Sequence, residues 1–187
     1  GPSLPKNLVD LDFGIKKNVN LLCEAKNTFP EKITVCVLNR PRHDDIINEL
    51  KSMKVNINFI TDGDVSGVIS VANPKSKIDM YVGIGGGPEG VLAAAALSCL
   101  DSQIQTRLVY QNEEEKERSQ KLGISNLNKK YNISDMVKDD VIFSATGVTN
   151  GDFLKGIINK EGFFFSETLL LHKSSKTNKI LKNKIKK

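Results

Sequence analysis

The chain has 187 residues, of which 39% are hydrophobic and 26% are charged, and its formal net charge is +5. This length suits one sizeable domain or two small ones, and the composition excludes a wholly disordered chain. No window approaches the roughly 20 apolar residues of a membrane span, so we do not expect a membrane partner.

The beginning of the chain, Gly1-Pro2-Ser3, has no initiator Met and no apolar signal-peptide core, which is typical of an internal piece of a longer protein or of a cloning remnant. The cysteines Cys23, Cys36 and Cys99 are far apart, lie in apolar stretches and form no CxxC pair. This pattern favours reduced thiols in a core over a zinc cluster or a disulfide framework.

Short apolar runs alternate with helix-like segments along the chain. Strands are predicted at 33–38, 55–60, 78–84, 107–110 and 141–147, followed by one long strand or a pair of strands at 163–171. Helices are predicted at 43–53, 88–100, 113–122 and 152–158. This alternation is typical of an α/β protein with a mainly parallel sheet, in which ligands gather at the carboxyl ends of the strands.

The first strong strand is followed by Asn39-Arg40-Pro41-Arg42-His43. Two arginines around a proline, at the start of a helix, can present planar guanidinium groups to a phosphate. Two solvated arginines in a loop are the plain alternative. His43 is a candidate general base, but we favour the interpretation that it helps to start the helix.

Two acids follow the strand at 55–60, in the turn Asp62-Gly63-Asp64. Paired carboxylates in a glycine turn accept hydrogen bonds from sugar hydroxyls or bind a metal. The alternative is a plain turn in which Asp64 caps the next helix.

A glycine-rich segment, residues 83–90, joins a strand to a helix that begins at Pro88. Bare glycines let backbone N–H groups approach an anionic ligand, and the helix N-terminus adds partial positive charge. Glu89 lies in the first helical turn, where it either stabilises the helix dipole or faces a bound cation.

The last two segments are polar. Residues 144–152 end a strand in a turn, and we expect most of their polar groups to cap the short helix predicted after it. Residues 173–187 hold seven lysines and no acid, which leaves the rest of the chain with a net charge of −2. We therefore divide the chain into a domain at 1–172 and a basic, poorly ordered tail at 173–187. No aromatic residues interleave with these lysines, so no nucleic-acid partner is expected.

Four motifs, taken in order, resemble the class II fructose-1,6-bisphosphatases of bacteria. They are Arg-Pro-Arg-His at 40–43, Asp-Gly-Asp-Val at 62–65, Gly-Ile-Gly-Gly-Gly-Pro-Glu-Gly-Val at 83–91 and Phe-Ser-Ala-Thr-Gly-Val-Thr-Asn-Gly-Asp-Phe-Leu at 143–154. The resemblance runs from about residue 1 to about residue 176 and covers roughly the C-terminal half of the family protein.

The resemblance implies a layered α/β/α fold with a mainly parallel or mixed sheet, similar to the C-terminal half of the inositol monophosphatase-like sugar phosphatases. It also implies a cytoplasmic enzyme of gluconeogenesis and glycerol metabolism. Such an enzyme hydrolyses the 1-phosphate of fructose 1,6-bisphosphate, its substrate, with Mn²⁺ or Mg²⁺.

Site residues are implied by the same resemblance. Glu89 matches a metal-ligating Glu of the family, and the family usually has Lys where this chain has Arg40. Residues 40–42 match the segment that holds the phosphate not being cleaved, and residues 62–64 match the segment that holds the sugar. The implied substrate-binding residues are Arg40, Pro41, Arg42, Asp62, Gly63, Asp64 and Gly86.

One departure from the family concerns the metal ligands. The other metal carboxylates of the family lie in Gly-Glu-Gly-Glu and Asp-Pro-x-Glu-Gly-Thr motifs, and neither occurs in this sequence. Hydrolysis by two metals needs several carboxylates around cations that are roughly 3.5–4 Å apart. We therefore expect no phosphatase activity from this chain alone, and either homo-oligomers or association with the missing N-terminal half.

Three alternative functions stay open. The first is sedoheptulose-1,7-bisphosphatase activity, whose sugar substrate has one carbon more than fructose. A dinucleotide-binding oxidoreductase domain is indicated by Gly85, Gly87 and Gly90, but the acid expected about 20 residues further on is missing after Tyr110. A non-catalytic sugar-phosphate-binding module would need no metal carboxylates.

Overall fold

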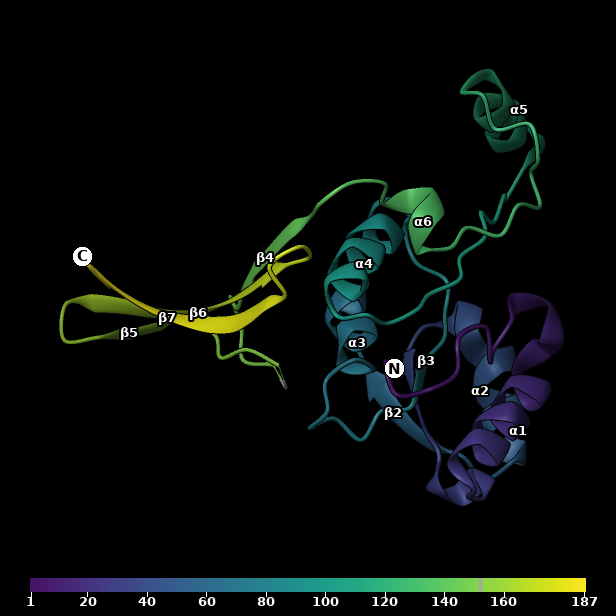
Figure 1. Ribbon diagram of the computed structural model, residues 1–187, viewed down its shortest axis with the longest axis horizontal. Helices are drawn as coiled ribbons and strands as arrows, with labels where there is room; N and C mark the ends of the chain where they lie inside the picture. The colour runs from purple at the N-terminus through teal and green to yellow at the C-terminus, as the bar shows by residue number, and fades with distance from the viewer. Residues whose placement is uncertain (152) are drawn as a thin grey trace.

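Two separate sheets organise the computed structural model, which describes residues 1–151 and 153–187 (Figure 1). The first sheet is parallel, with the order β2–β1–β3, and the second is antiparallel with β6 at its centre. The predicted α/β class is therefore confirmed, with parallel and antiparallel strands both present. The strands are β1 (Thr34–Leu38), β2 (Asn56–Ile60), β3 (Met80–Tyr81), β4 (Ile142–Thr146), β5 (Ile158–Lys160), β6 (Phe163–His172) and β7 (Thr177–Lys186).

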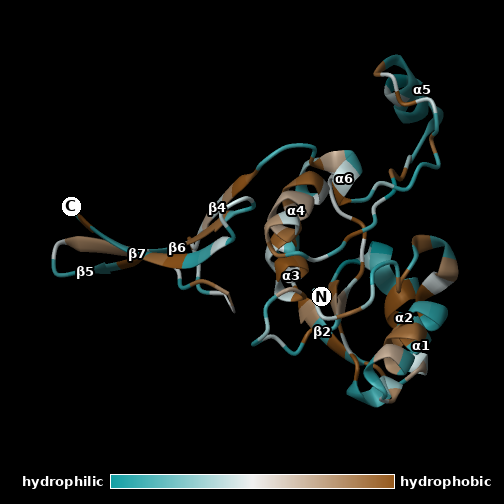
Figure 2. Cartoon of the chain, in the orientation of Figure 1, coloured by the Kyte–Doolittle hydropathy of each residue, from teal (hydrophilic) through white to brown (hydrophobic). Residues whose placement is uncertain are grey.

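Helices cover both faces of the parallel sheet. The helices are α1 (Gly14–Lys26), α2 (Asp44–Ser52), α3 (Asp64–Ser70), α4 (Gly87–Cys99), α5 (Glu113–Lys121) and α6 (Ile133–Met136), with 3₁₀ turns η1 (Leu11–Phe13), η2 (Pro30–Lys32) and η3 (Pro41–His43). Three of the four predicted helices, at 43–53, 88–100 and 113–122, are confirmed as α2, α4 and α5. Helix α5 is polar over most of its surface, as Figure 2 shows, and it buries no residue.

The layering follows from the alternation of side chains along β1. Val35 and Val37 point to one face and join the core that α1 and α2 supply. Cys36 points to the other face, where its sulfur lies against Gly67 of α3. Figure 1 shows α1 and α2 on one side of this sheet and α3 and α4 on the other.

The second sheet packs on the far side of α4. Phe143, Leu169 and Leu171 are buried with Ala96 and Cys99 of that helix. Because α4 carries four consecutive alanines at 93–96, its backbone can approach neighbours closely on two sides. The outer part of the sheet extends beyond α4, away from the helices (Figure 1).

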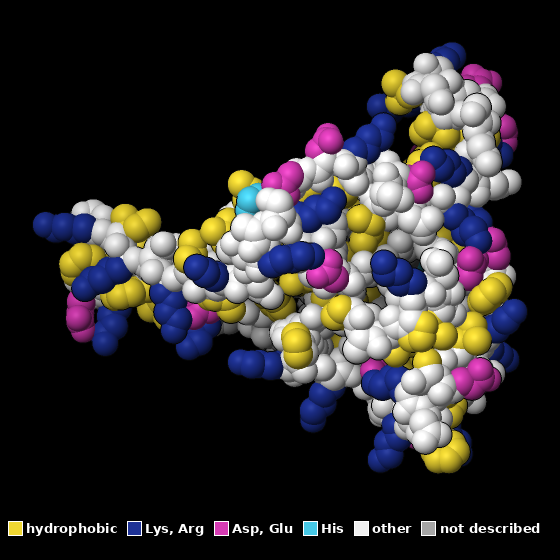
Figure 3. All heavy atoms as spheres, viewed as in Figure 1, with side chains coloured by type: hydrophobic (Ala, Val, Ile, Leu, Met, Phe, Trp, Pro, Cys, Tyr) yellow, Lys and Arg dark blue, Asp and Glu magenta, His cyan; other side chains and the backbone are white. Residues whose placement is uncertain are grey.

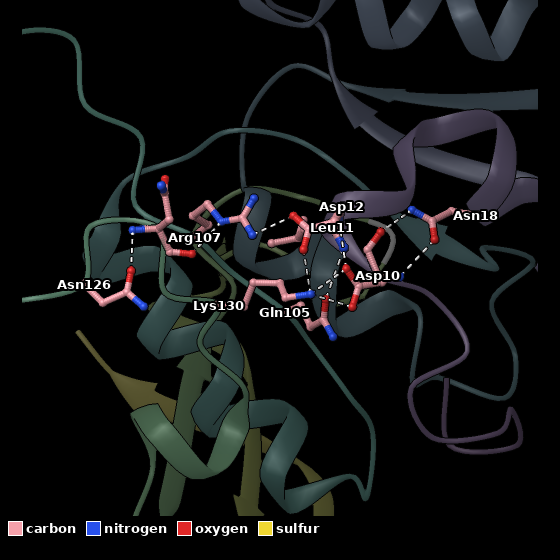
Figure 4. A network of polar contacts seen from close by, with 9 residues as sticks. Asp10, Leu11, Asp12, Asn18, Gln105, Arg107, Asn126 and Lys130 are labelled. Carbon is pink, nitrogen blue, oxygen red and sulfur yellow. Dashed lines mark hydrogen bonds and ion pairs between the residues drawn. The ribbon is translucent and has the colours of Figure 1, made fainter.

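A network of polar contacts ties the N-terminal segment to the loop before α6 (Figure 4). Lys130 Nζ lies 2.7 Å from both carboxylate oxygens of Asp10 and 2.8 Å from Asp12 Oδ2, and Arg107 Nη2 lies 2.7 Å from Asp12 Oδ1. Hydrogen bonding to Lys130 lowers the pKa of Asp10 and of Asp12, and Arg107 adds to the effect at Asp12.

Among the helices in the described residues, none is long and apolar enough to cross a membrane.

Three predicted elements differ in the structure. The strand predicted at 78–84 is reduced to Met80–Tyr81, because the glycines that follow leave the sheet as a loop. Residues 107–110 form no strand, and pairing there is one bridge between Thr106 and Tyr131. The helix predicted at 152–158 is wrong over 153–157, and residue 152 lies outside the described residues. Gly156 N–H donates to Asn150 Oδ1, so the chain folds back there into a loop.

The expected poorly ordered tail at 173–187 is also wrong. β7 pairs with β6 over ten successive residue pairs, from Phe163–Lys186 to His172–Thr177. Apolar residues between the lysines give the segment a strand pattern that the charge count concealed. The pairing also places Lys184 Nζ 4.0 Å from the Phe163 ring centroid, so aromatic rings do lie beside these lysines.

Candidate functional site

Three loops meet at the carboxyl end of the parallel sheet. They follow β1, β2 and β3, and they carry the residues 40–43, 61–64 and 83–87. Because β2 and β3 both pair in parallel with β1, their carboxyl ends share one edge, which is the usual ligand-binding edge of such sheets.

Two arginines in the first loop are held by different neighbours. Arg42 Nε donates to the carbonyl oxygen of Ile84 at 2.8 Å, so this guanidinium lies on the glycine loop. Arg40 Nη2 donates to the carbonyl oxygen of Thr61 at 2.7 Å and Nη1 to Asn39 at 3.3 Å. No described residue accepts from the Nη atoms of Arg42, whereas those of Arg40 are engaged. Arg42 is therefore better placed to bind an anion with both Nη atoms.

His43 connects the first loop to the third. Its side chain is fully buried, Nδ1 lies 2.7 Å from the Leu38 carbonyl oxygen, and Nε2 accepts the Ile84 N–H at 2.8 Å. These bonds fix the neutral tautomer with the proton on Nδ1. Because both ring nitrogens are used, His43 positions the glycine loop and is not available as a general base. It precedes α2 but makes no side-chain cap bond to it.

Asp64 lies against the glycine loop. A Cβ atom built on Gly85 would be 2.8 Å from Asp64 Oδ2, so any side chain at position 85 would displace this carboxylate. Gly63, with φ of +74°, turns the chain into α3 so that Asp64 is the first helical residue. The neighbouring carboxylate of Asp62 accepts from the Gly63 N–H, so it stabilises its own turn.

Glu89 lies against the same loop, three residues after Gly86. It lies in the first turn of α4, and its carboxylate occupies the space that a Cβ on Gly86 would need. Pro88 precedes it at the start of the helix, where a missing N–H costs nothing. The carboxylates of Asp64 and Glu89 therefore lie against Gly85 and Gly86, near the N-terminus of α4, where the helix dipole is positive.

Tyr81 is a member of the site that the sequence did not indicate. It ends β3, and its hydroxyl would lie 3.6 Å from a Cβ on Gly83. Burial raises the pKa of Tyr81 to about 12, and the negative charge of Asp64 adds to this effect while Arg42 opposes it. The sequence signal for Tyr81 was an aromatic residue two positions before the first glycine of the loop.

The structure thus brings together four of the predicted residues: Arg42, Asp64, Gly86 and Glu89. Arg40, Asp62 and Gly63 lie beside them in the same loops, and Pro41 opens η3. Within residues 1–151 and 153–187, no group of three or more His, Cys, Asp or Glu side chains is close enough to hold a metal ion. The carboxylates of Asp64 and Glu89 are oxygen donors of the kind that divalent cations prefer, but two of them do not complete a coordination shell.

A hollow lies elsewhere on the molecule. Its volume is about 420 Å³, and most of its lining residues are apolar, among them Ile69 of α3, Leu100 directly after α4, and Ile180 of β7. None of the predicted site residues lines it. Since this hollow offers no cluster of charges, the three loops are the better candidate for phosphate chemistry.

The fold and the loops define an α/β protein whose ligand edge combines a glycine loop, a helix N-terminus, an arginine and two carboxylates. The family model for bacterial fructose-1,6-bisphosphatase, glpX-encoded, matches residues 1–185, and the chain belongs to this family.

Two curated relatives support this assignment. The class 2 fructose-1,6-bisphosphatase of Haemophilus influenzae is 36% identical over 186 residues, which is 92% of this chain and 56% of that protein. Fructose-1,6-bisphosphatase 1 class 2 of Escherichia coli K12 is also 36% identical over 186 residues, with 92% and 55% covered. The chain therefore spans a little over half the length of the relatives that it matches.

Proposed function

We propose that this chain supplies the sugar-phosphate-binding portion of a metal-dependent phosphatase that hydrolyses fructose 1,6-bisphosphate to fructose 6-phosphate and phosphate. The family and the names of its relatives support the substrate. The single observation that supports the site is the meeting of Arg42, Asp64 and Glu89 at the glycine loop. The enzyme would act in the cytoplasm, in gluconeogenesis and glycerol metabolism.

The phosphate that is not cleaved binds to the arginines. Arg42 offers two Nη atoms to it, in a fork that matches phosphate oxygens. Arg40 contributes charge from the rim, because its own Nη atoms are held by backbone carbonyls. Anchoring the far phosphate positions the near one, which lowers the entropy cost of reaching the reactive geometry.

The sugar and the metal bind at the acidic side of the loop. Asp62 and Asp64 accept hydrogen bonds from sugar hydroxyls, and Gly86 lacks a side chain and so leaves room for the Glu89 carboxylate beside the substrate. Glu89 holds one side of Mn²⁺ or Mg²⁺, which neutralises phosphate charge and activates water when bound. One carboxylate cannot complete a two-metal site, so the remaining ligands come from the part of the enzyme that this chain does not span.

It follows that the isolated chain binds the substrate without hydrolysing it. Calorimetric titration with fructose 1,6-bisphosphate in Mn²⁺ should show binding, and a phosphate-release assay on the same sample should show none. Arg42→Ala should weaken binding at least about tenfold, since a charge-assisted pair is lost. Arg118→Ala, an exposed arginine on α5, is the matched control and should leave binding unchanged.

Each outcome has a separate meaning. Phosphate release by the pure chain would contradict the need for outside carboxylates. Absence of binding, or equal losses in Arg42→Ala and Arg118→Ala, would contradict the site itself. Parallel titrations with sedoheptulose 1,7-bisphosphate test the nearest alternative substrate.

A dinucleotide site fits the geometry less well. The carboxylates of Asp64 and Glu89 occupy the approach to Gly85 and Gly86, where a pyrophosphate would have to lie. The negative charges of these carboxylates and of a pyrophosphate in contact with the loop repel each other unless a cation lies between them. Titration with NADH, read by nicotinamide fluorescence, should therefore give no saturable signal.

A further inference from the structure

Tyr81 lies at the base of the three-loop site, two residues before the first glycine of the third loop. It ends β3 and is in register with Cys36 of β1, so both side chains lie on the face of the sheet that α3 covers. A Cβ atom built on Gly83 would be 3.6 Å from the Tyr81 hydroxyl oxygen. The hydroxyl therefore lies beside the beginning of the glycine loop.

The ring of Tyr81 is held by its packing. A Cβ atom on Gly67 of α3 would be only 3.2 Å from Cε2 of the ring, so glycine at this position leaves room for the aromatic side chain. The ring also packs against a core cluster from α3 and α4 that includes Val68 and Leu97. Because the ring is confined on these sides, the position of its hydroxyl is fixed before any ligand arrives.

Two opposite charges act on this hydroxyl. Burial raises the pKa of Tyr81 to about 12, the negative charge of Asp64 adds to the effect, and the positive charge of Arg42 opposes it. The side chain is therefore neutral near pH 7, where its O–H can donate one hydrogen bond and its oxygen can accept another. Tyr81 thus lies within electrostatic reach of the carboxylate proposed for the sugar and of the guanidinium proposed for the phosphate.

A neutral hydroxyl differs in its chemistry from the charged groups of the site. Arg42 donates as a cation, which suits phosphate oxygens, whereas Asp64 and Glu89 accept as anions. A sugar hydroxyl both donates and accepts, and the phenol of Tyr81 can pair with it in either sense. A protein group that is placed to bond a ligand hydroxyl discriminates against a ligand without one, because the group then loses its partner.

We propose that Tyr81 is a specificity-determining residue of the three-loop site. Its hydroxyl bonds to an oxygen of the sugar, between the phosphate on Arg42 and the hydroxyl on Asp64, and so favours a phosphorylated polyol over a phosphate ligand that has no hydroxyls. This inference rests on the proposed function, because it names what the same site recognises in its substrate.

The test needs a ligand with the same phosphates and no hydroxyls. 1,6-Hexanediol bisphosphate has two phosphates on a six-carbon chain and meets this need. The chain has a net charge of +5, and Lys and Arg side chains are spread over the face seen in Figure 3, so both ligands meet the same unspecific attraction. Calorimetric titration in Mn²⁺ compares the affinity of each variant for this ligand and for fructose 1,6-bisphosphate.

Tyr81→Phe removes the hydroxyl and keeps the ring. Its affinity for fructose 1,6-bisphosphate should fall at least about fivefold, whereas its affinity for hexanediol bisphosphate should change less than about twofold. Tyr131→Phe is the matched control, because Tyr131 lies outside the three loops, in the bridge with Thr106, and it should leave both affinities unchanged. Urea unfolding checks that each variant is folded.

A second measurement uses the wild-type chain and does not depend on the folding of Tyr81→Phe. With ¹³C at the Cζ atom of tyrosine, the chain gives one signal for each of its three tyrosines. The variants Tyr110→Phe and Tyr131→Phe assign the other two signals. Fructose 1,6-bisphosphate should shift the Tyr81 signal further than hexanediol bisphosphate does, because only the sugar offers a hydroxyl to the phenol.

The outcomes separate this inference from the proposed function. Equal losses for the two ligands in Tyr81→Phe would overturn the inference, because the hydroxyl would then hold the loop or bind phosphate. Unchanged affinities in that variant, or equal shifts of the Tyr81 signal by both ligands, would overturn it too. If Arg42→Ala still weakens binding in these cases, the site stands and only the role of Tyr81 is lost. Absence of binding by the wild-type chain would contradict both.

Discussion

Replacing His43 by Ala should destabilise the protein and disturb the candidate site together. The side chain is fully buried and bonds to the Leu38 carbonyl oxygen and the Ile84 N–H. Alanine leaves the Ile84 N–H without its partner, whereas the Leu38 carbonyl oxygen still accepts from the Arg40 N–H. An unpaired group costs about 1–3 kcal/mol, and the cavity left by the buried ring adds to this loss. The free energy of unfolding should therefore fall by about 2–5 kcal/mol, a large part of the total for a domain.

Urea unfolding, followed by circular dichroism, measures this loss. The other histidine provides the control: His172 is partly exposed and bonds to Asp140 and Ser175 at a turn, so His172→Ala should cost about 1 kcal/mol or less. The calorimetric affinity for fructose 1,6-bisphosphate should fall in His43→Ala only, since Ile84 lies in the glycine loop. A loss below about 0.5 kcal/mol would refute the positioning role of His43.

Three further predictions follow from the same contacts. Gly86→Ala should displace the Glu89 carboxylate and so remove any gain in sugar-phosphate affinity on adding Mn²⁺. Gly87→Ala is the control, because a Cβ atom there meets nothing within 4 Å, and it should keep that gain. Calorimetric titration of the two variants with and without Mn²⁺ measures the difference. Asp64→Asn should lower the pKa of Tyr81 from its value of about 12, as read from tyrosinate absorbance, because a neighbouring negative charge is removed. Lys130→Met should lower the melting temperature near pH 7. The pKa values of Asp10 and Asp12 lie below their ordinary value near 3.8, so this stabilisation exists above that pH. The difference between the two proteins should therefore shrink as pH falls below about 4, and an unchanged difference would contradict the network.

The sequence predicted the site best where chemistry follows a strand. The loops at 40–43, 62–64 and 83–89 were located because arginine, paired acids and glycines each follow a β-branched run. Tyr81 and His43 were not predicted as partners of the glycine loop, because both roles depend on burial, and that of His43 also depends on its contact with Ile84, 41 positions away.

In the C-terminal sheet, β4 and β6 were predicted, but β7 and the loop at 153–157 were not. The lysines at 173–187 indicated a solvated tail by composition, but pairing with β6 depends on the partner strand and not on local charge. The loop at 153–157 was predicted as part of a short helix that follows Asn150-Gly151. The bond from Gly156 N–H to Asn150, which closes the loop instead, carries no periodic signal.

Amide chemical-shift mapping during a titration with fructose 1,6-bisphosphate tests the central proposal most directly. The account predicts the largest shifts at Arg42, Asp64 and residues 84–87, with saturation at one equivalent. Shifts confined to the lysines of β7, or spread along them without saturation, would mean that the sugar phosphate binds by charge alone and would contradict the assigned site.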